Sequence, residues 1–86
     1  MDKDALVQAA ARRTAQTGAG VAPEEVERVI DALFGTLEHP GAIAEGLKRG
    51  ETVSVIGFGA FHLDDSAYPT LRPGQALHEY VNGTAR

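Results

Sequence analysis

The chain has 86 residues, the length of one small domain, and no cysteine, which excludes a disulfide scaffold and every thiolate metal site. Eight basic and twelve acidic residues give a formal charge of −4, and this acidic balance counts against a protein that coats nucleic acid by bulk charge alone. Hydrophobic residues make up 43%, which is typical of a globular protein, but no apolar run is long enough to span a membrane. Since the sequence also lacks the basic start and apolar run of a signal peptide, we expect a cytoplasmic protein.

The small size of the chain predicts that it has a partner. A chain this short buries only roughly 60–65% of its unfolded surface, so its stability is marginal. Without disulfides or a metal to compensate, such a fold often completes its core by pairing. We therefore expect an oligomer before any motif is considered.

The start of the chain has the periodicity of a helix. Asp2 is a candidate N-cap for a helix from about Lys3 to Thr14, whose apolar stripe is narrow and rich in small residues. Arg12 and Arg13 would then lie in the last turn of this helix, where cations complement the helix dipole. Residues 16–20 are expected to form a loop.

A second helix is expected to begin at Pro23, because proline suits the first helical position. It carries the strongest apolar periodicity in the chain, at Val26, Val29, Ile30, Leu33, Phe34 and Leu37. So wide a stripe needs a large apolar surface to pack against. Pro40 interrupts it, and a short helical segment follows that ends at Lys48 and Arg49, with Gly50 as its C′ residue.

The pattern then changes to that of strands. Residues 52–56 and 60–63 predict an antiparallel pair, joined by a tight turn at Gly57-Phe58-Gly59 where a positive φ costs little. Asp64-Asp65-Ser66 is expected to be a second turn, followed by a short third strand at residues 68–71 that Pro69 restricts to an edge or a bend. A last short helix is expected to open at Arg72-Pro73-Gly74 and to end at Asn82-Gly83.

Together these elements predict a single α+β domain. Residues 1–50 would form a helical base, residues 51–71 a three-stranded antiparallel sheet, and residues 72–83 a C-terminal helix.

Two motifs resemble those of a known family. Val55-Ile56-Gly57-Phe58-Gly59-Ala60-Phe61 is similar to the turn of the bacterial HU/IHF family of histone-like DNA-binding proteins. The family's C-terminal motif, Pro-x-Phe-x-Pro-Gly-x-x-Leu, resembles the segment Pro69 to Leu77, with Leu71 in place of the usual aromatic residue. The first helix, the second helix and the end of the helical base also resemble the family, so the match covers most of the chain in the right order.

The resemblance implies an intertwined dimer. In HU-like proteins two helical hairpins form a base under a saddle of strands, and aromatic residues of the turn region fill the shared core. The matching residues in this chain are Phe34, Phe58 and Phe61. This agrees with the size argument, because three phenylalanines and a wide helical stripe are too much apolar surface for a lone chain of this length to bury.

The sequence departs from the family where its DNA-binding arms should be. Family members carry two long β-ribbon arms, rich in arginine and lysine, that wrap the minor groove and wedge a proline between base pairs. Here only six residues, His62 to Ala67, separate Phe61 from Tyr68, and two of them are acidic and none is basic. Because bending DNA costs about 1–6 kcal/mol, which added contacts must offset, a chain without the arm is not expected to bend DNA sharply. A second departure is an insert from Glu38 to Ile43, which contains Pro40.

The resemblance also implies that the body of the fold holds phosphates with helix N-termini and with turn amides, neither of which needs a basic side chain. The candidate DNA contacts are Lys3, Lys48, Arg49, Gly57, Phe58, Gly59, Arg72, Gly74 and Gln75. Each has a plainer interpretation, since Gly57 and Gly59 are needed for the turn in any case and the cations are ordinary surface charges. Arg72 is the strongest single candidate.

The remaining motif searches are negative. His62 stands where a dinucleotide-binding fingerprint would have its third glycine, and a strand follows instead of a helix. The histidines lack metal-ligand spacing, and Ser54 and Ser66 lack the context of a nucleophile. We therefore expect neither an enzyme nor a cofactor, metal or small-molecule substrate.

Two functions remain. The first is weak, sequence-independent DNA binding by an arm-less HU-like protein that helps to condense the chromosome in the bacterial nucleoid, as a homodimer or as a heterodimer with a longer HU-like paralogue. The second is a dimeric protein-interaction module that has the same fold and does not bind DNA. A homodimer would carry twice −4, or −8, and Asp64 and Asp65 stand where an arm would begin, which favours the second function.

Overall fold

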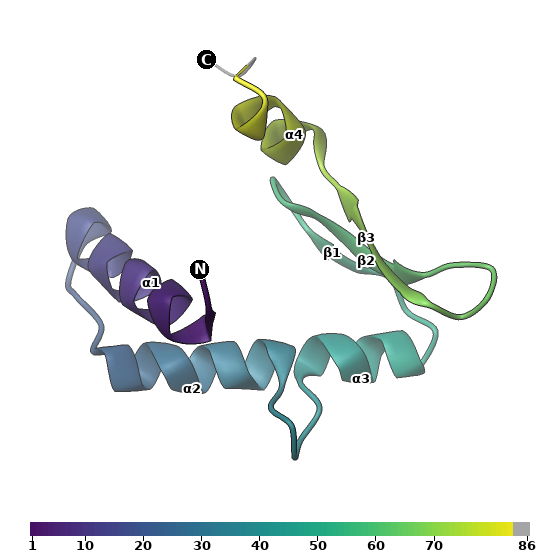
Figure 1. The fold of residues 1–86 in the computed structure, drawn as a ribbon, viewed down its shortest axis with the longest axis horizontal. Coiled ribbons are helices and arrows are strands. Elements are labelled where there is room, and N and C mark those ends of the chain that lie inside the picture. The colour runs from purple at the N-terminus through teal and green to yellow at the C-terminus, as the bar shows by residue number, and fades with distance from the viewer. Residues whose placement is uncertain (84–86) are drawn as a thin grey trace. The chain divides into compact units, whose positions relative to one another are not determined.

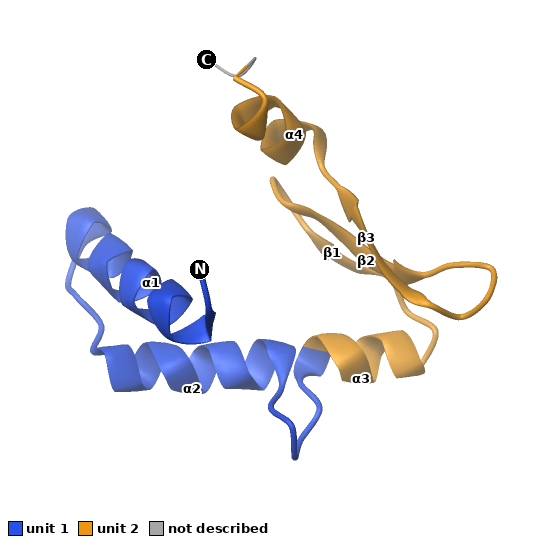
Figure 2. Ribbon diagram, in the orientation of Figure 1, with its two compact units in different colours: residues 1–42 blue, residues 43–86 orange. Residues whose placement is uncertain are grey.

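A computed structural model describes residues 1–83, and across them the chain forms four helices and three strands in the order α1, α2, α3, β1, β2, β3, α4 (Figure 1). This order confirms the predicted α+β class. The chain divides into two compact units, residues 1–42 and residues 43–86 (Figure 2). Within residues 1–83, no helix is both long and apolar enough to cross a bilayer.

The first unit begins with α1, Lys3–Thr17. Asp2 caps it as predicted, because its carboxylate Oδ1 accepts a hydrogen bond from the amide of Ala5 at 2.8 Å. The expected end at Thr14 is wrong, since the helix continues to Thr17 and its last turn has no basic residue, so Arg12 and Arg13 lie further inside the helix. The Thr14 hydroxyl donates to the Ala11 carbonyl at 2.6 Å and accepts from the amide of Val21 at 2.8 Å. One side chain therefore fixes the connection to the next helix.

The second helix, α2, spans Pro23–Phe34 and has Pro23 in its first turn, as predicted. It ends before the apolar stripe does, because Gly35 adopts a φ of +86° and its amide donates to the Asp31 carbonyl. Leu37, expected on the stripe, is instead fully exposed at 106%. The periodicity therefore overestimates the length of this helix.

Residues 35–41 form a closed loop at the predicted insert. Gly35 pairs with Pro40 in an antiparallel bridge, and the amide of Thr36 donates to the His39 carbonyl at 2.8 Å. A Cβ atom on Gly35 would lie 2.6 Å from the amide nitrogen of Gly41, so only glycine fits where the two ends of the loop meet. The predicted insert, Glu38 to Ile43, coincides with this loop only in part, because Ala42 and Ile43 begin the next helix. The loop does interrupt the helical base at Pro40, as predicted.

A short helix, α3, spans Ala42–Lys48 and ends as the sequence predicts. Gly50 adopts a φ of +81°, its amide donates to the Leu47 carbonyl at 2.9 Å, and the amide of Glu51 donates to the Gly46 carbonyl at 3.0 Å. This pair of hydrogen bonds is a Schellman motif with glycine at C′.

The second unit contains a three-stranded antiparallel sheet of β1 (Val53–Val55), β2 (Gly59–Leu63) and β3 (Pro69–Pro73), with β2 in the middle. The register pairs Val53 with Phe61 in β1 and β2, and Phe61 with Leu71 in β2 and β3. Pro69 lies on an edge strand as predicted. The hairpin from β2 to β3 is short, so the long arm of the resembled family is missing.

Both predicted turns are present in the sheet. Gly57 has a φ of +84°, and the amide of Phe58 closes the first turn on the Val55 carbonyl at 2.9 Å. In the second turn Asp64 Oδ1 accepts from the amides of Ser66 and Tyr68 at 2.8 Å and 2.9 Å. An aspartate that bonds backbone amides further along the chain is typical of tight turns.

The last helix, α4, spans Gln75–Val81 with Gly74 as its N-cap. The prediction that Arg72 and Pro73 open this helix is wrong, because both belong to β3 and pair with Ala60 and Gly59. Extended backbone is the conformation that a residue before proline favours, so Arg72 continues the strand.

The buried core within a single chain is small. In residues 1–83 the buried hydrophobic side chains are Val7, Val26, Leu47 and Ala60, and no side chain is completely buried. Phe34 is 56% exposed and Phe58 42%, while Phe61 is half-buried. A single chain therefore leaves about half of Phe34 and a substantial part of Phe58 exposed to solvent.

Candidate nucleic-acid interface

The sheet has one apolar face and one polar face. Directly paired residues of antiparallel strands point to the same side, and successive residues alternate between sides. The register therefore places on one face Val53, Val55, Gly59, Phe61, Leu63, Pro69, Leu71 and Pro73. The opposite face, which we call the polar face, consists of Ser54, Ala60, His62, Thr70 and Arg72.

The two faces of the sheet differ in the chemistry of their exposed side chains. On the apolar face Val55, Leu63 and Leu71 are 46%, 36% and 38% exposed, so this side has apolar area for a partner to cover. The polar face instead presents a guanidinium, an imidazole and two hydroxyl groups, of the kinds that proteins use to contact phosphate oxygens. Ser54, His62 and Thr70 were not among the predicted site residues, although alternation along β1 and β2 could have found them once the strand register was known.

Arg72 is the cation of the polar face. It lies on the edge strand β3, directly opposite Ala60 of β2, and its side chain is exposed. Within residues 1–83 no ion pair to Arg72 is present, in contrast to Lys3 and Arg49. Its charge is therefore available to an anion outside the chain.

Hydrogen bonds within the chain hold the turn at Gly57-Phe58-Gly59, which lies next to Arg72. The amide of Phe58 donates to Val55 and its carbonyl accepts from the amide of Gly74 at 2.8 Å. A Cβ on Gly59 would lie 2.5 Å from the Arg72 carbonyl oxygen, so the close approach of β2 to β3 requires glycine here. Arg72, Gly59, Phe58 and Gly74 are brought together, but the amides of Phe58 and Gly74 are already used within the chain.

Gln75 begins α4 beside this turn. Its side-chain amide donates to Glu79 Oε2 at 2.7 Å, one turn further along the helix. The side chain therefore stabilises α4. Its predicted role towards a phosphate rests on the backbone amide alone.

Lys3, in the first unit, is bound to α2. Its ammonium forms an ion pair with Asp31 Oδ1 and lies 3.8 Å from Glu27 Oε2. The hydrogen bond to Asp31, followed by the attraction of Asp31 and Glu27, raises the pKa of Lys3 above its ordinary value. This cation joins α1 to α2, so its charge is already balanced inside the chain.

The cations at the end of α3 differ from one another. Arg49 Nε donates to Glu51 Oε2 at 3.0 Å, and this contact raises the pKa of Arg49 and lowers that of Glu51. Lys48 is exposed and forms no ion pair with the residues from 1 to 83. Of the two, Lys48 has the charge that is free for an external anion.

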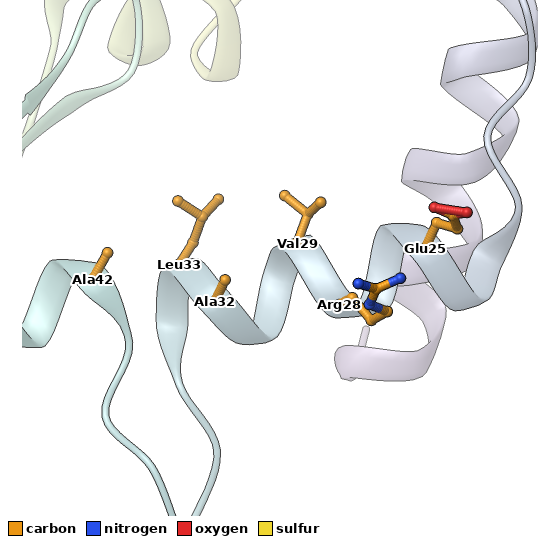
Figure 3. A pocket seen from close by; sticks show the side chains of 6 residues that line it. All are labelled: Glu25, Arg28, Val29, Ala32, Leu33 and Ala42. Atoms are coloured by element: carbon orange, nitrogen blue, oxygen red, sulfur yellow. The ribbon is translucent and has the colours of Figure 1, made fainter.

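A second apolar surface lies along α2 in the first unit. Val29 and Leu33 are 59% and 43% exposed and line an open groove with Ala32 and Ala42 (Figure 3). The side chains of Val29 and Leu33 point to the same side of the helix in this view, one turn apart (Figure 3). This groove, which we call the α2 groove, has Glu25 and Arg28 at one end. It leaves much of the predicted apolar stripe without a packing partner.

The described residues contain no group of three histidine, aspartate or glutamate side chains that could hold a metal ion. The candidate interface for nucleic acid is the polar face of the sheet, in the second unit. The α2 groove, in the first unit, and the apolar face of the sheet are two separate apolar surfaces.

A helical hairpin followed by a small antiparallel sheet and a final helix is an architecture shared with known proteins. No family model matches the sequence, and no curated protein matches it. Among solved structures, a point mutant of HU from Thermotoga maritima is 32% identical over 94% of this chain and 99% of its own, with a TM-score of 0.68. A further structure of HU from Thermotoga maritima is 33% identical over 94% of this chain and 98% of its own, with a TM-score of 0.62.

These likenesses cover nearly the whole of both chains at more than 30% identity, and the order of elements agrees with the resemblance found in the sequence motifs. The chain belongs to the HU family.

Proposed function

We propose that the chain is a nucleoid-associated protein that binds DNA weakly and without sequence preference, with the polar face of its sheet towards the phosphates. The observation that carries the proposal is the division of the sheet, which separates a face made of apolar residues from an exposed Arg72 that forms no ion pair with any residue from 1 to 83. A phosphate contact of this kind carries no sequence information, so binding would be insensitive to base sequence.

The proposal includes a dimer of two identical chains. The α2 groove and the apolar face of the sheet each have exposed apolar side chains, and Phe34 and Phe58 are open to solvent. Burying a large apolar side chain contributes about 1.5–3 kcal/mol, so covering these surfaces with a second copy is strongly favoured. A longer HU-like paralogue could replace one copy and would form the corresponding contacts.

The short hairpin limits what this protein does to DNA. The turn between β2 and β3 contains Asp64 and Asp65 and no cation. Because sharp bending must be offset by added contacts, we expect a site with few cations to leave the duplex close to straight. An enzymatic activity has no support in the polar face, because among the described residues the His62 imidazole and the Thr70 hydroxyl form hydrogen bonds with backbone carbonyls and not with each other.

Fluorescence anisotropy with a nicked duplex, titrated from low to moderate salt, tests the proposal. We expect measurable binding at low ionic strength and a shallow dependence of log K on log salt, because the slope counts the phosphates neutralised. No binding at low ionic strength by a correctly folded protein would contradict the proposal.

Replacing Arg72 by glutamate locates the contact on the polar face. We expect Arg72→Glu to weaken binding to all sequences alike and to reduce the magnitude of the salt slope by about 1 for each phosphate that the variant no longer neutralises. Arg12→Glu is the matched control, since it changes the net charge equally from a helix of the other unit. Equal effects of the two substitutions would show that net charge, and not the polar face, governs binding.

A second function is favoured by the charges of the molecule. The net charge of a homodimer would be −8, and Lys3 and Arg49 are paired with carboxylates inside the chain. These observations suit a dimeric protein-interaction module without DNA affinity. A stable dimer that leaves the duplex unbound at low ionic strength would support this function over DNA binding.

A further inference from the structure

The polar face contains a second nitrogen-bearing side chain, the imidazole of His62. His62 pairs with Thr70 in the register, and Ala60, two residues before it in β2, pairs with Arg72. His62 and Arg72 are therefore diagonal neighbours on one face, a relation that places residues at about 7–8 Å from each other. A single phosphodiester backbone lying on this face would meet both side chains.

The hydrogen bond of His62 determines which ring nitrogen carries the proton in the neutral imidazole. Nδ1 lies 3.3 Å from the carbonyl oxygen of Leu63, and because a carbonyl can only accept, Nδ1 must carry the proton of this bond. Pro69, opposite Leu63 in the register, has no N–H to offer this carbonyl. In the neutral imidazole, Nε2 is then an acceptor with a lone pair, which a phosphate oxygen repels.

Protonation of the His62 imidazole turns this repulsion from a phosphate oxygen into an attraction. An imidazolium carries a proton on both ring nitrogens, so Nε2 becomes a charged donor while the bond from Nδ1 to Leu63 is kept. A charged donor forms a stronger hydrogen bond to a phosphate oxygen than a neutral one does. One proton thus changes His62 from a repulsive group to an attractive one without moving the ring.

Within the described strands, no residue of the polar face carries a carboxylate. From β3 the groups on the polar face are the Thr70 hydroxyl and the Arg72 guanidinium, and from β1 the Ser54 hydroxyl. Along β2 the next carboxylate is Asp64, whose Oδ1 is held in the turn by the amides of Ser66 and Tyr68.

We propose that His62 is a proton-dependent phosphate contact, so that this protein binds DNA more tightly as the pH falls from 8 to 6. This inference rests on the proposed DNA binding and adds a second contact and its regulation. Carboxylates remain ionised across this range, so their titration does not produce the effect.

Anisotropy titrations of the nicked duplex at pH 8.0 and pH 6.0 test the inference on the full chain. We expect the wild-type Kd to decrease about two- to fivefold at pH 6.0 for each His62 contact, which is the range of an exposed ion pair. The salt slope should steepen at pH 6.0 by about 0.9 for each phosphate that a protonated His62 neutralises. An unchanged Kd and slope would overturn the proposal.

Two substitutions at position 62 test whether His62, and not another group of the protein, causes the pH dependence of DNA binding. His62→Gln cannot gain a proton and is expected to lose the gain in affinity at pH 6.0. His62→Lys is charged at both pH values and is expected to bind at pH 8.0 as tightly as the wild type binds at pH 6.0. Circular dichroism melts at both pH values would establish that each variant is folded.

The matched control is the double variant His39→Gln and His78→Gln, which removes the other two imidazoles of the chain, both outside the polar face. It should keep the wild-type response to pH. If instead His62→Gln keeps the response, the inference fails while DNA binding stands. If the wild type binds at neither pH, the proposed function fails as well.

Discussion

Asp64 stabilises the short turn that joins β2 to β3. Its Oδ1 accepts from two amides, its own amide donates to the Tyr68 carbonyl at 3.0 Å, and its carbonyl accepts from Ala67 at 2.9 Å. Ala67 adopts a φ of +61°, which costs energy for a residue with a Cβ. The hydrogen bonds to Asp64 offset this strain and end the hairpin.

Replacing Asp64 by alanine should destabilise the fold. Two backbone amides would lose their acceptor, and by analogy with the loss of a helix cap we expect a decrease of about 1 kcal/mol in the free energy of unfolding. Asp65→Ala is the matched control at the neighbouring position, where no hydrogen bond from a backbone amide to the side chain is found within residues 1–83. Chemical denaturation of both variants checks the prediction, which equal losses would contradict.

At position 59, the neighbouring strand leaves room only for glycine. A Cβ there would meet the Arg72 carbonyl at 2.5 Å and the Leu71 side chain at 3.2 Å. We expect Gly59→Ala to destabilise the protein by about 1–3 kcal/mol, as overpacking does, and thermal unfolding would measure it. Gly18→Ala, at a position with open space around it, should change stability by no more than about 0.5 kcal/mol.

Among the elements, α2 shows most clearly which features can be predicted from the sequence and which depend on the folded structure. Its start at Pro23 and its apolar periodicity were predictable, because both depend on local backbone chemistry. Its end was not, since Gly35 and Gly41 approach each other only in the folded loop. The apolar pattern continues to Leu37 although the helix ends at Phe34, and the spacing of apolar residues alone cannot reveal this end.

The α2 groove gives a prediction that distinguishes two leucines. Leu33 lines the groove, whereas Leu37 lies in the loop with its side chain fully exposed. We expect Leu33→Ser to weaken dimer formation by up to about 1.5–3 kcal/mol for each buried leucine, and Leu37→Ser to leave it unchanged. Sedimentation over a range of concentrations would measure both dissociation constants, and equal effects would show that α2 is not part of the dimer contact.

Only part of the candidate site could be predicted from the sequence, because the rest depends on contacts that form on folding. Arg72 was identified from a motif, but its expected place at the start of a helix was wrong, because β3 runs on to Pro73. The register then places His62, Thr70 and Ser54 beside it on one face, which no local pattern could specify. Pairing between strands is a long-range choice, so the polar face becomes visible only in the folded sheet.

For the whole molecule, the balance between buried and exposed apolar groups is the decisive quantity. Only four hydrophobic side chains within residues 1–83 are buried, whereas Val29, Phe34 and Phe58 are 59%, 56% and 42% exposed. A small domain has little stability in reserve, so a core as incomplete as this one is expected to require a second chain.

Light scattering on a sizing column at micromolar concentration measures the mass of the protein in solution and tests the requirement for a second chain most directly. We expect a single species of twice 9.1 kDa, with no folded monomer on dilution before unfolding begins. A stable, folded species of 9.1 kDa would contradict this expectation, because the apolar surfaces would then be exposed without a partner.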